Sequence, residues 1–247
     1  MNATNTQMNR LTDHIGGWTD GLEQDRRSRP LFFERLAAMV SVPADRDALG
    51  DVERALIGVA VVGNVANTNW TRLDAHVRRA LRAGATPDQV RDVLQMVSIM
   101  SIHAMTSGLP ALMKVLRERG LAPTADLDAH RQRLKDEFER RRGYWHDSWN
   151  DVLTLAPEMF EAYTAFSAAA TDEGALDEKL RELIYIAIDC IPTHMYAPGV
   201  EIHARRALDA GATPEQIVTA IEIAALVGAD PYIQAAQSSS LFEGQSV

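Results

Sequence analysis

The chain has 247 residues, 46% of them hydrophobic and 6% aromatic, which is enough to bury the core of one large domain or two small ones. Its formal charge of −9 repels a phosphate backbone, and no run of about 18 uncharged apolar residues occurs, so we expect no nucleic-acid partner, no membrane partner and a cytoplasmic location. The single cysteine, Cys190, excludes an intrachain disulfide and any Cys-x-x-Cys redox or zinc motif.

Two parts of the chain repeat each other at a fixed offset of 127 residues without a gap. Residues 76–90 (HVRRALRAGATPDQV) return as residues 203–217 (HARRALDAGATPEQI). The same offset relates the pairs Trp18/Trp145, Pro30/Pro157, Phe33/Phe160, Leu56/Leu183 and Ala60/Ala187. The matched unit runs from about residue 18 to 120 and again from about 145 onward. We therefore predict a tandem duplication, with a first repeat at 1–124 and a second at 125–247.

The clearest helix boundaries of the first repeat lie between Gly84 and Gln89. Glycine is typical of the left-handed residue that ends a helix, because it has no side chain to strain. Thr86 is a typical N-cap, Pro87 suits the first helical position, and Gln89 can reach back to the cap. One helix is thus expected to end at Gly84 and the next to begin after Thr86. Apolar residues then recur at helical spacing at Val90, Val93, Leu94 and Val97.

The segment between the matched units contains three consecutive arginines at 140–142, next to Lys135, Glu137 and Glu139. Such a run can bind nucleic acid, but its mixture with acidic residues at helical spacing is typical of a solvated helix face. We predict the solvated face.

The second repeat carries the same boundary residues at Gly211 and at 213–216. Neither repeat shows a long alternating apolar pattern or an Asn-Gly hairpin turn. Short links between helices favour antiparallel neighbours in a compact bundle. The sequence therefore predicts an all-α fold made by tandem duplication of one helical bundle.

Residues 181–188 (RELIYIAI), 203–217 and 84–90 resemble the carboxymuconolactone decarboxylase and alkyl hydroperoxidase D-like superfamily. The resemblance covers most of both repeats and implies an alkyl hydroperoxidase D-like helical bundle. It also implies small subunits that assemble as rings, commonly hexamers or trimers of dimers. A fused tandem chain would then form a homo-oligomer, with a trimer favoured. Activity varies within the superfamily, so the resemblance is more specific for fold than for reaction.

The peroxidase branch of that superfamily uses a glutamate, a Cys-x-x-Cys pair and a histidine as a proton relay around a redox disulfide. Here the family glutamate corresponds to Glu182 and the family histidine to His203. The region between them has no second thiol, and Cys190 lies upstream of the expected pair. The resemblance therefore does not extend to the peroxidase mechanism.

We identify His203, His194 and Glu182 as the candidate catalytic residues. An imidazole can take and return a proton near neutral pH, and Glu182 could orient it. Glu182 and His194 are specific to the second repeat, because their counterparts in the first repeat are Ala55 and Asn67. This asymmetry predicts one competent site, built mainly on the second repeat. A structural histidine at a helix interface and an exposed loop histidine remain alternative interpretations.

Six residues are candidates for substrate binding, because they are polar, aromatic or basic side chains close to these positions or their counterparts in the first repeat. They are Tyr196, Arg206, Cys190, Glu201, Trp70 and His76. Glu201 also fits a solvated carboxylate, and Arg206 an ordinary surface arginine. The chain has no His-x-x-x-His or Glu-x-x-His pair and no glycine-rich phosphate loop, so we predict no metal and no cofactor.

The leading hypothesis is a cofactor-independent lyase or decarboxylase that acts on a small oxygenated organic acid or lactone by histidine-mediated proton transfer. One alternative is a peroxide or thiol redox enzyme that uses Cys190. Another is a non-catalytic, ring-forming binding protein on an inherited enzyme fold.

Overall fold

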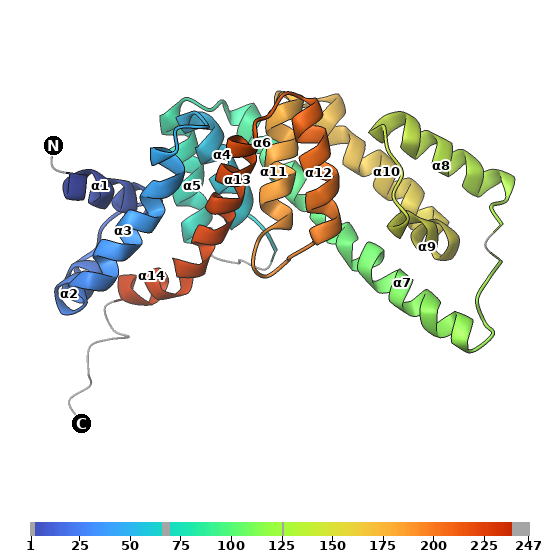
Figure 1. The fold of residues 1–247 in the computed structure, drawn as a ribbon, viewed down its shortest axis with the longest axis horizontal. Helices are drawn as coiled ribbons and strands as arrows, with labels where there is room; N and C mark the ends of the chain where they lie inside the picture. Colours follow the sequence, from blue (N-terminus) through green and yellow to red (C-terminus); the bar gives the residue numbers. More distant parts are fainter. Residues whose placement is uncertain (1–2, 66–69, 125, 239–247) are drawn as a thin grey trace. The chain divides into compact units, whose positions relative to one another are not determined.

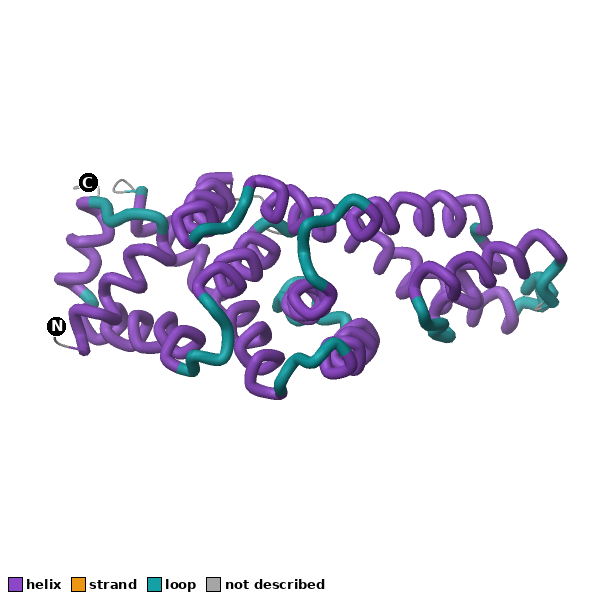
Figure 2. Tube along the Cα trace, turned by 90° about the horizontal axis from the view of Figure 1, so that it is seen from above, coloured by secondary structure: helices purple, strands orange, loops and turns teal. Residues whose placement is uncertain are grey.

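The computed structural model describes residues 3–65, 70–124 and 126–238. Within these ranges every regular element is helical and no strand occurs, which confirms the predicted all-α class (Figure 2). The helices of the first repeat are α1 (Ala3–Ile15), α2 (Asp20–Ser28), α3 (Pro30–Asp45), α4 (Asp51–Val62), α5 (Trp70–Ala83), α6 (Pro87–Ser98), the 3₁₀ turn η1 (Ile99–Ile102) and α7 (His103–Glu118). Those of the second are α8 (Ala129–Arg142), α9 (Ser148–Leu155), α10 (Pro157–Asp172), α11 (Glu178–Asp189), α12 (Ala197–Asp209), α13 (Pro214–Ala225), η2 (Leu226–Ala229) and α14 (Asp230–Gln237).

The helices of the two repeats follow each other in the same order and keep the offset of 127 residues. For example, α3 and α10 begin at Pro30 and Pro157, and α6 and α13 begin at Pro87 and Pro214. The duplication is therefore confirmed. It also reaches further than the matched residues indicate, because α1 and α8 occupy equivalent places before Trp18 and Trp145.

The predicted capping boxes are present in both repeats. The Thr86 N–H donates to Gln89 Oε1 at 2.9 Å, and the Gln89 N–H donates to Thr86 Oγ1 at 3.1 Å. The pair of Thr213 and Gln216 forms the same two bonds, at 3.0 and 3.3 Å. Each box satisfies two N–H groups that have no partner inside the helix, which fixes where the helix begins.

The described chain divides into two compact units that do not coincide with the repeats. One unit comprises residues up to 97 and from 175 onward, and the other comprises 98–174 (Figure 1). The first unit thus combines α1–α6 of the first repeat with α11–α14 of the second. Its centre is formed by α4 and α11, which pack together and are almost wholly buried. Burial on nearly every face explains the apolar run within each helix, ALIGVAVV at 55–62 and LIYIAI at 183–188.

The second unit has an aromatic core of its own. The ring of Phe138 lies 5.0 Å from that of Trp149 and 5.4 Å from that of Phe160, and Trp149 stacks on Tyr163. Such ring pairs add about 0.5–1.5 kcal/mol each beyond the area they bury. Of the three arginines predicted to form a solvated face, Arg140 and Arg141 are exposed and pair with Glu137, whereas Arg142 is half-buried.

Two continuous helical stretches, 87–118 and 214–237, are long and apolar enough to cross a membrane by length and composition alone. They occupy equivalent positions in the two repeats. Both contain fully buried core residues, including Val93 and Met96 in the first and Ala220 and Ala224 in the second. In each stretch, 39% of the window that meets this test is buried inside the protein.

Candidate functional site

The predicted residues Glu182 and His203 form a direct pair between α11 and α12. The distance from His203 Nδ1 to Glu182 Oε2 is 2.7 Å. The other carboxylate oxygen, Oε1, accepts a hydrogen bond of 2.8 Å from Arg206 Nε. Glu182 is buried, whereas His203 keeps 17% of its side chain exposed. The carboxylate is therefore the inner, anchoring member of the pair.

The electrostatics of this pair define its protonation. Burial raises the pKa of Glu182, but the hydrogen bonds and charges of His203 and Arg206 outweigh burial and leave that pKa below its usual value. An ionised carboxylate only accepts hydrogen bonds, so His203 carries its proton on Nδ1 and leaves Nε2 to exchange a proton. Tyr185 stacks on the imidazole with the ring centroids 4.6 Å apart. Carboxylate and tyrosine thus hold the ring in one orientation.

The third predicted catalytic residue, His194, belongs to a separate pair. Its Nε2 lies 3.6 Å from Oδ1 of Asp189, at the end of α11. Asp189 follows Glu182 by seven residues, which is about 10 Å along a helix. The two acids share one face of α11, but each faces its own histidine. The structure therefore joins Glu182 to His203 and does not add His194 to that pair.

A close approach of two helices shapes the His194 pair. A Cβ atom added at Gly199 would lie 2.0 Å from Asp189 Oδ2, far inside van der Waals contact. Only glycine allows α12 to begin this close to α11. The sequence motif around Gly199 thus has a packing role that its pattern did not predict.

The predicted substrate-binding residues fall in different environments. Arg206 holds Glu182, and the backbone N–H of Tyr196 donates to the Asp189 carbonyl. Glu201 is exposed and pairs with Arg205, which fits the solvated alternative. Trp70 lies at the start of α5 and is 76% exposed, whereas His76 is buried in the same helix. Cys190 follows the end of α11.

Cys190 is poorly suited to thiol chemistry. Burial, followed by the negative charge of Asp189, raises the pKa of its thiol. The thiolate is the reactive form, so a raised pKa lowers its share at neutral pH.

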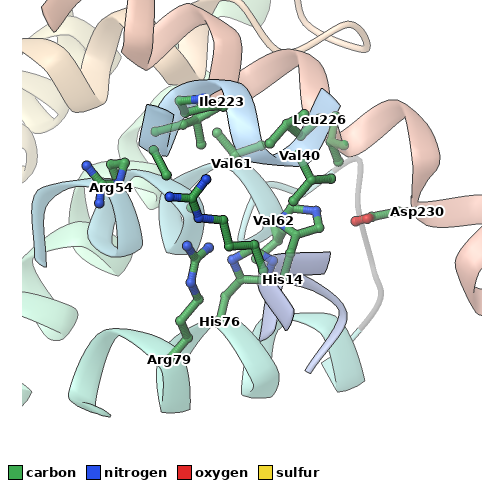
Figure 3. A pocket seen from close by; sticks show the side chains of 15 residues that line it. His14, Val40, Arg54, Val61, Val62, His76, Arg79, Ile223, Leu226 and Asp230 are labelled. Atoms are coloured by element: carbon green, nitrogen blue, oxygen red, sulfur yellow. The ribbon is translucent and has the colours of Figure 1, made fainter. Parts of the chain in front are cut away.

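A pocket of the first unit lies against the first repeat (Figure 3). Histidine and arginine side chains of α1, α4 and α5 line it together with apolar side chains. The lining residues are Arg10, His14, Val40, Pro43, Ala44, Arg54, Gly58, Val61, Val62, His76, Arg79, Ile223, Leu226, Val227 and Asp230. Among them only His76 was a predicted site residue.

A buried arginine, Arg72, ties this region together. Its Nη1 donates to the His14 carbonyl at 2.6 Å, and its Nη2 lies 2.9 Å from Asp230 Oδ1. The same Nη2 lies 3.3 Å from Nε2 of His14 and 3.3 Å from Nε2 of His76. Arg72 is only 1% exposed. The first repeat therefore has its own polar centre, although the sequence asymmetry favoured the second.

Sequence reasoning missed His14, Arg72, Arg79 and Asp230. His14 precedes the matched repeat units, and Asp230 lies 158 residues after Arg72. One usable indication was present, because Arg72 replaces a residue that is Gly199 in the second repeat. A charged residue that replaces glycine between two copies of one helix marks a place where the copies differ in packing.

Comparison with known proteins agrees with this architecture. Residues 30–118 and 157–238 match the carboxymuconolactone decarboxylase family, one segment in each repeat. A crystal structure from Burkholderia xenovorans, of a protein proposed to be a gamma-carboxymuconolactone decarboxylase subunit, superposes with a TM-score of 0.87. It is 36% identical, and the match covers 94% of each chain. None of the curated proteins matches.

The two matched segments cover most of the chain and coincide with the two helical repeats. The protein therefore belongs to the carboxymuconolactone decarboxylase family, as a tandem two-repeat member with a single cysteine.

Proposed function

We propose that the protein is a cofactor-independent lyase that decarboxylates a small oxygenated organic acid or lactone, with His203 as the proton-transfer residue. The observation that carries this proposal is the 2.7 Å contact between His203 Nδ1 and the ionised, buried Glu182. A carboxylate in this position orients the imidazole and keeps the Nδ1 proton in place. Membership of the family and the similar Burkholderia protein support the same reaction class.

The chemistry assigned to the pair is simple. The bond between the substrate carbon and its carboxylate breaks, carbon dioxide leaves, and the electron pair stays on the substrate as an enolate. Protonated His203 gives its Nε2 proton to that carbon and then regains a proton from water. Glu182 stays ionised throughout, because Arg206 and the imidazole both stabilise its charge.

The test is carbon dioxide release from a panel of carboxylated lactones and unsaturated keto acids. We expect His203→Gln to lower turnover by about 10²–10⁴-fold, the usual contribution of a general acid or base. Glu182→Gln should lower it by at least about tenfold, because the imidazole loses its orienting charge. His130→Gln is the matched control, since that histidine is 48% exposed on α8. Wild-type turnover in His203→Gln would contradict the assignment.

The thiol redox alternative has no comparable support. It requires a reactive thiolate at Cys190, whereas burial and Asp189 raise the pKa of that thiol. Alkylation of Cys190 should therefore leave carbon dioxide release unchanged, and loss of turnover on alkylation would favour this alternative.

A further inference from the structure

The pocket of the first repeat is lined by His76, whose Nδ1 has no hydrogen-bond partner among the described residues. Arg72 carries only donors, so an N–H on Nε2 of His76, which lies 3.3 Å from Arg72 Nη2, would face another donor, and that nitrogen is therefore unprotonated. A neutral imidazole that accepts at Nε2 carries its proton on Nδ1. Burial, the charge of Arg72 and the neighbouring histidine lower the pKa of His76 well below its usual value, so the ring is neutral. His76 thus presents an Nδ1–H group.

That Nδ1–H group is buried and has no hydrogen-bond partner among the residues that the structure describes. His76 is only 2% exposed. A buried donor left without a partner costs about 1–3 kcal/mol, so it marks a place where a ligand acceptor would be stabilised.

The absence of a side chain at Gly58 leaves space beside this donor. Both residues line the pocket, and a Cβ atom added at Gly58 would lie 2.8 Å from His76 Nδ1. The equivalent residue of the second repeat is Tyr185, whose ring stacks on His203 instead. The duplication has therefore left space beside the histidine of one repeat and filled it with an aromatic ring in the other.

The charges around the pocket favour an anion. Arg10, Arg54 and Arg79 line it (Figure 3), and the charge of Arg79 is one of the causes that lower the pKa of His76. Burial, and then the charge of Arg54, lower the pKa of Arg79 although Asp13 pairs with it. An anion bound near Arg79 would stabilise its positive charge, which would offset both the burial of the guanidinium and its repulsion by Arg54.

The carboxylate partners of these arginines do not neutralise the pocket from within. Asp13, Asp45 and Asp51 have 44%, 56% and 83% of their side chains exposed, and none of them lines the pocket. Exposed ion pairs of this kind are weak, since water screens them. The one acid in the lining is Asp230, which already binds Arg72.

The apolar lining residues and the size of the pocket define the rest of the ligand. Val40, Val61, Val62, Ile223 and Leu226 provide an apolar surface. The cavity volume is about 40 Å³. This volume is the space open to the centre of a water-sized sphere, and one water needs about 10–15 Å³ of it, so the pocket holds roughly three waters. A short hydrocarbon with one charged group fits such a space.

We propose that this pocket is a binding site for a short-chain carboxylate. The carboxylate accepts from the His76 Nδ1–H and from the Arg79 guanidinium, and its hydrocarbon part lies against the valine and isoleucine side chains. Neither Glu182 nor His203 lines the pocket. The site is therefore distinct from the pair of Glu182 and His203 that carries the proposed function. An experiment can contradict one of the two proposals without contradicting the other.

The test uses sodium acetate as the probe, titrated into the full chain by calorimetry, with sodium chloride holding the ionic strength constant. We expect saturable binding by the wild-type protein. His76→Phe and Arg79→Gln should each weaken it by at least about tenfold, because each removes a charged or buried hydrogen bond to the ligand. Arg78→Gln is the matched control on the same helix, since Arg78 is 69% exposed, pairs with Asp74 and does not line the pocket.

A second measurement keeps the proposal testable if His76→Phe does not fold. Proton–nitrogen correlation spectra of the wild-type imidazoles should show the neutral, Nδ1-protonated form of His76, and its Nδ1–H signal should shift as acetate saturates the protein. Absence of saturable binding would overturn the proposal. So would equal binding by wild type and Arg79→Gln, or an Nδ1–H signal that acetate does not move.

Discussion

Arg72 shows how one buried charge sets the protonation of its neighbours. Its Nη2 lies 3.3 Å from Nε2 of His14 and 3.3 Å from Nε2 of His76, and it pairs with Asp230 at 2.9 Å. Burial and then the charge of Arg72 lower the pKa of His14, and burial, His14 and Arg72 lower that of His76. Both histidines are therefore neutral in the folded protein at pH values where an unfolded histidine is charged.

We predict that acid destabilises the protein through these two histidines. Unfolded histidines bind protons below about pH 6.5, whereas the folded ones do not, so the unfolded state gains protons first as the pH falls. The free energy of unfolding should be flat above about pH 7.5 and should fall below about pH 6.5, by up to about 1.4 kcal/mol per pH unit for each histidine. Urea unfolding between about pH 5.5 and 7.5 measures this slope before most carboxylates titrate.

Two variants isolate the effect. His14→Gln should reduce the slope, because it removes one buried imidazole. His130→Gln should leave the slope unchanged, since its side chain is 48% exposed. A slope in His14→Gln equal to that of the wild type would contradict the assignment.

At the scale of elements, the contact between α11 and α12 depends on the absence of a side chain. An added Cβ at Gly199 would meet Asp189 and Tyr196 within 2.8 Å. By contrast, a Cβ added at Gly108 in the middle of α7 would meet nothing within 4 Å. The two helical glycines therefore have opposite roles, one in packing and one without a steric requirement.

We predict that Gly199→Ala lowers the free energy of unfolding by about 1–3 kcal/mol, the usual cost of forcing extra volume into a packed contact. Gly108→Ala should be neutral or stabilising by up to about 1 kcal/mol, because alanine favours a helix interior. Urea denaturation of the two variants provides the comparison. Equal stability of both would show that α12 can move away from Asp189 at little cost.

At the scale of the whole molecule, large apolar side chains remain exposed at equivalent positions of the two repeats. Phe32 and Met39 on α3 correspond to Met159 and Phe166 on α10, and they are between 42% and 54% exposed. Exposed apolar side chains that recur at matching sites are typical of surfaces that a second copy covers.

We therefore predict a homotrimer, in which these helix faces contact neighbouring copies. Light scattering should give three times the chain mass of 27.2 kDa. The double variant Met39→Glu, Phe166→Glu should shift the mass toward one chain, because charges would be buried in the contact. Leu121→Glu is the control, since Leu121 is 70% exposed and follows the end of α7. A monomeric wild-type protein would refute the prediction.

The sequence by itself determined the duplication, the helix boundaries at Thr86 and Thr213, and the candidates Glu182 and His203, because each depends on local pattern or on comparison of the repeats. Only the tertiary structure decided which side chains meet. It paired His194 with Asp189 rather than with Glu182, and it joined Arg72 to His14 and Asp230. The physical reason is that a buried charge is stabilised by partners from remote helices, and the packing of those helices is not encoded in any one segment.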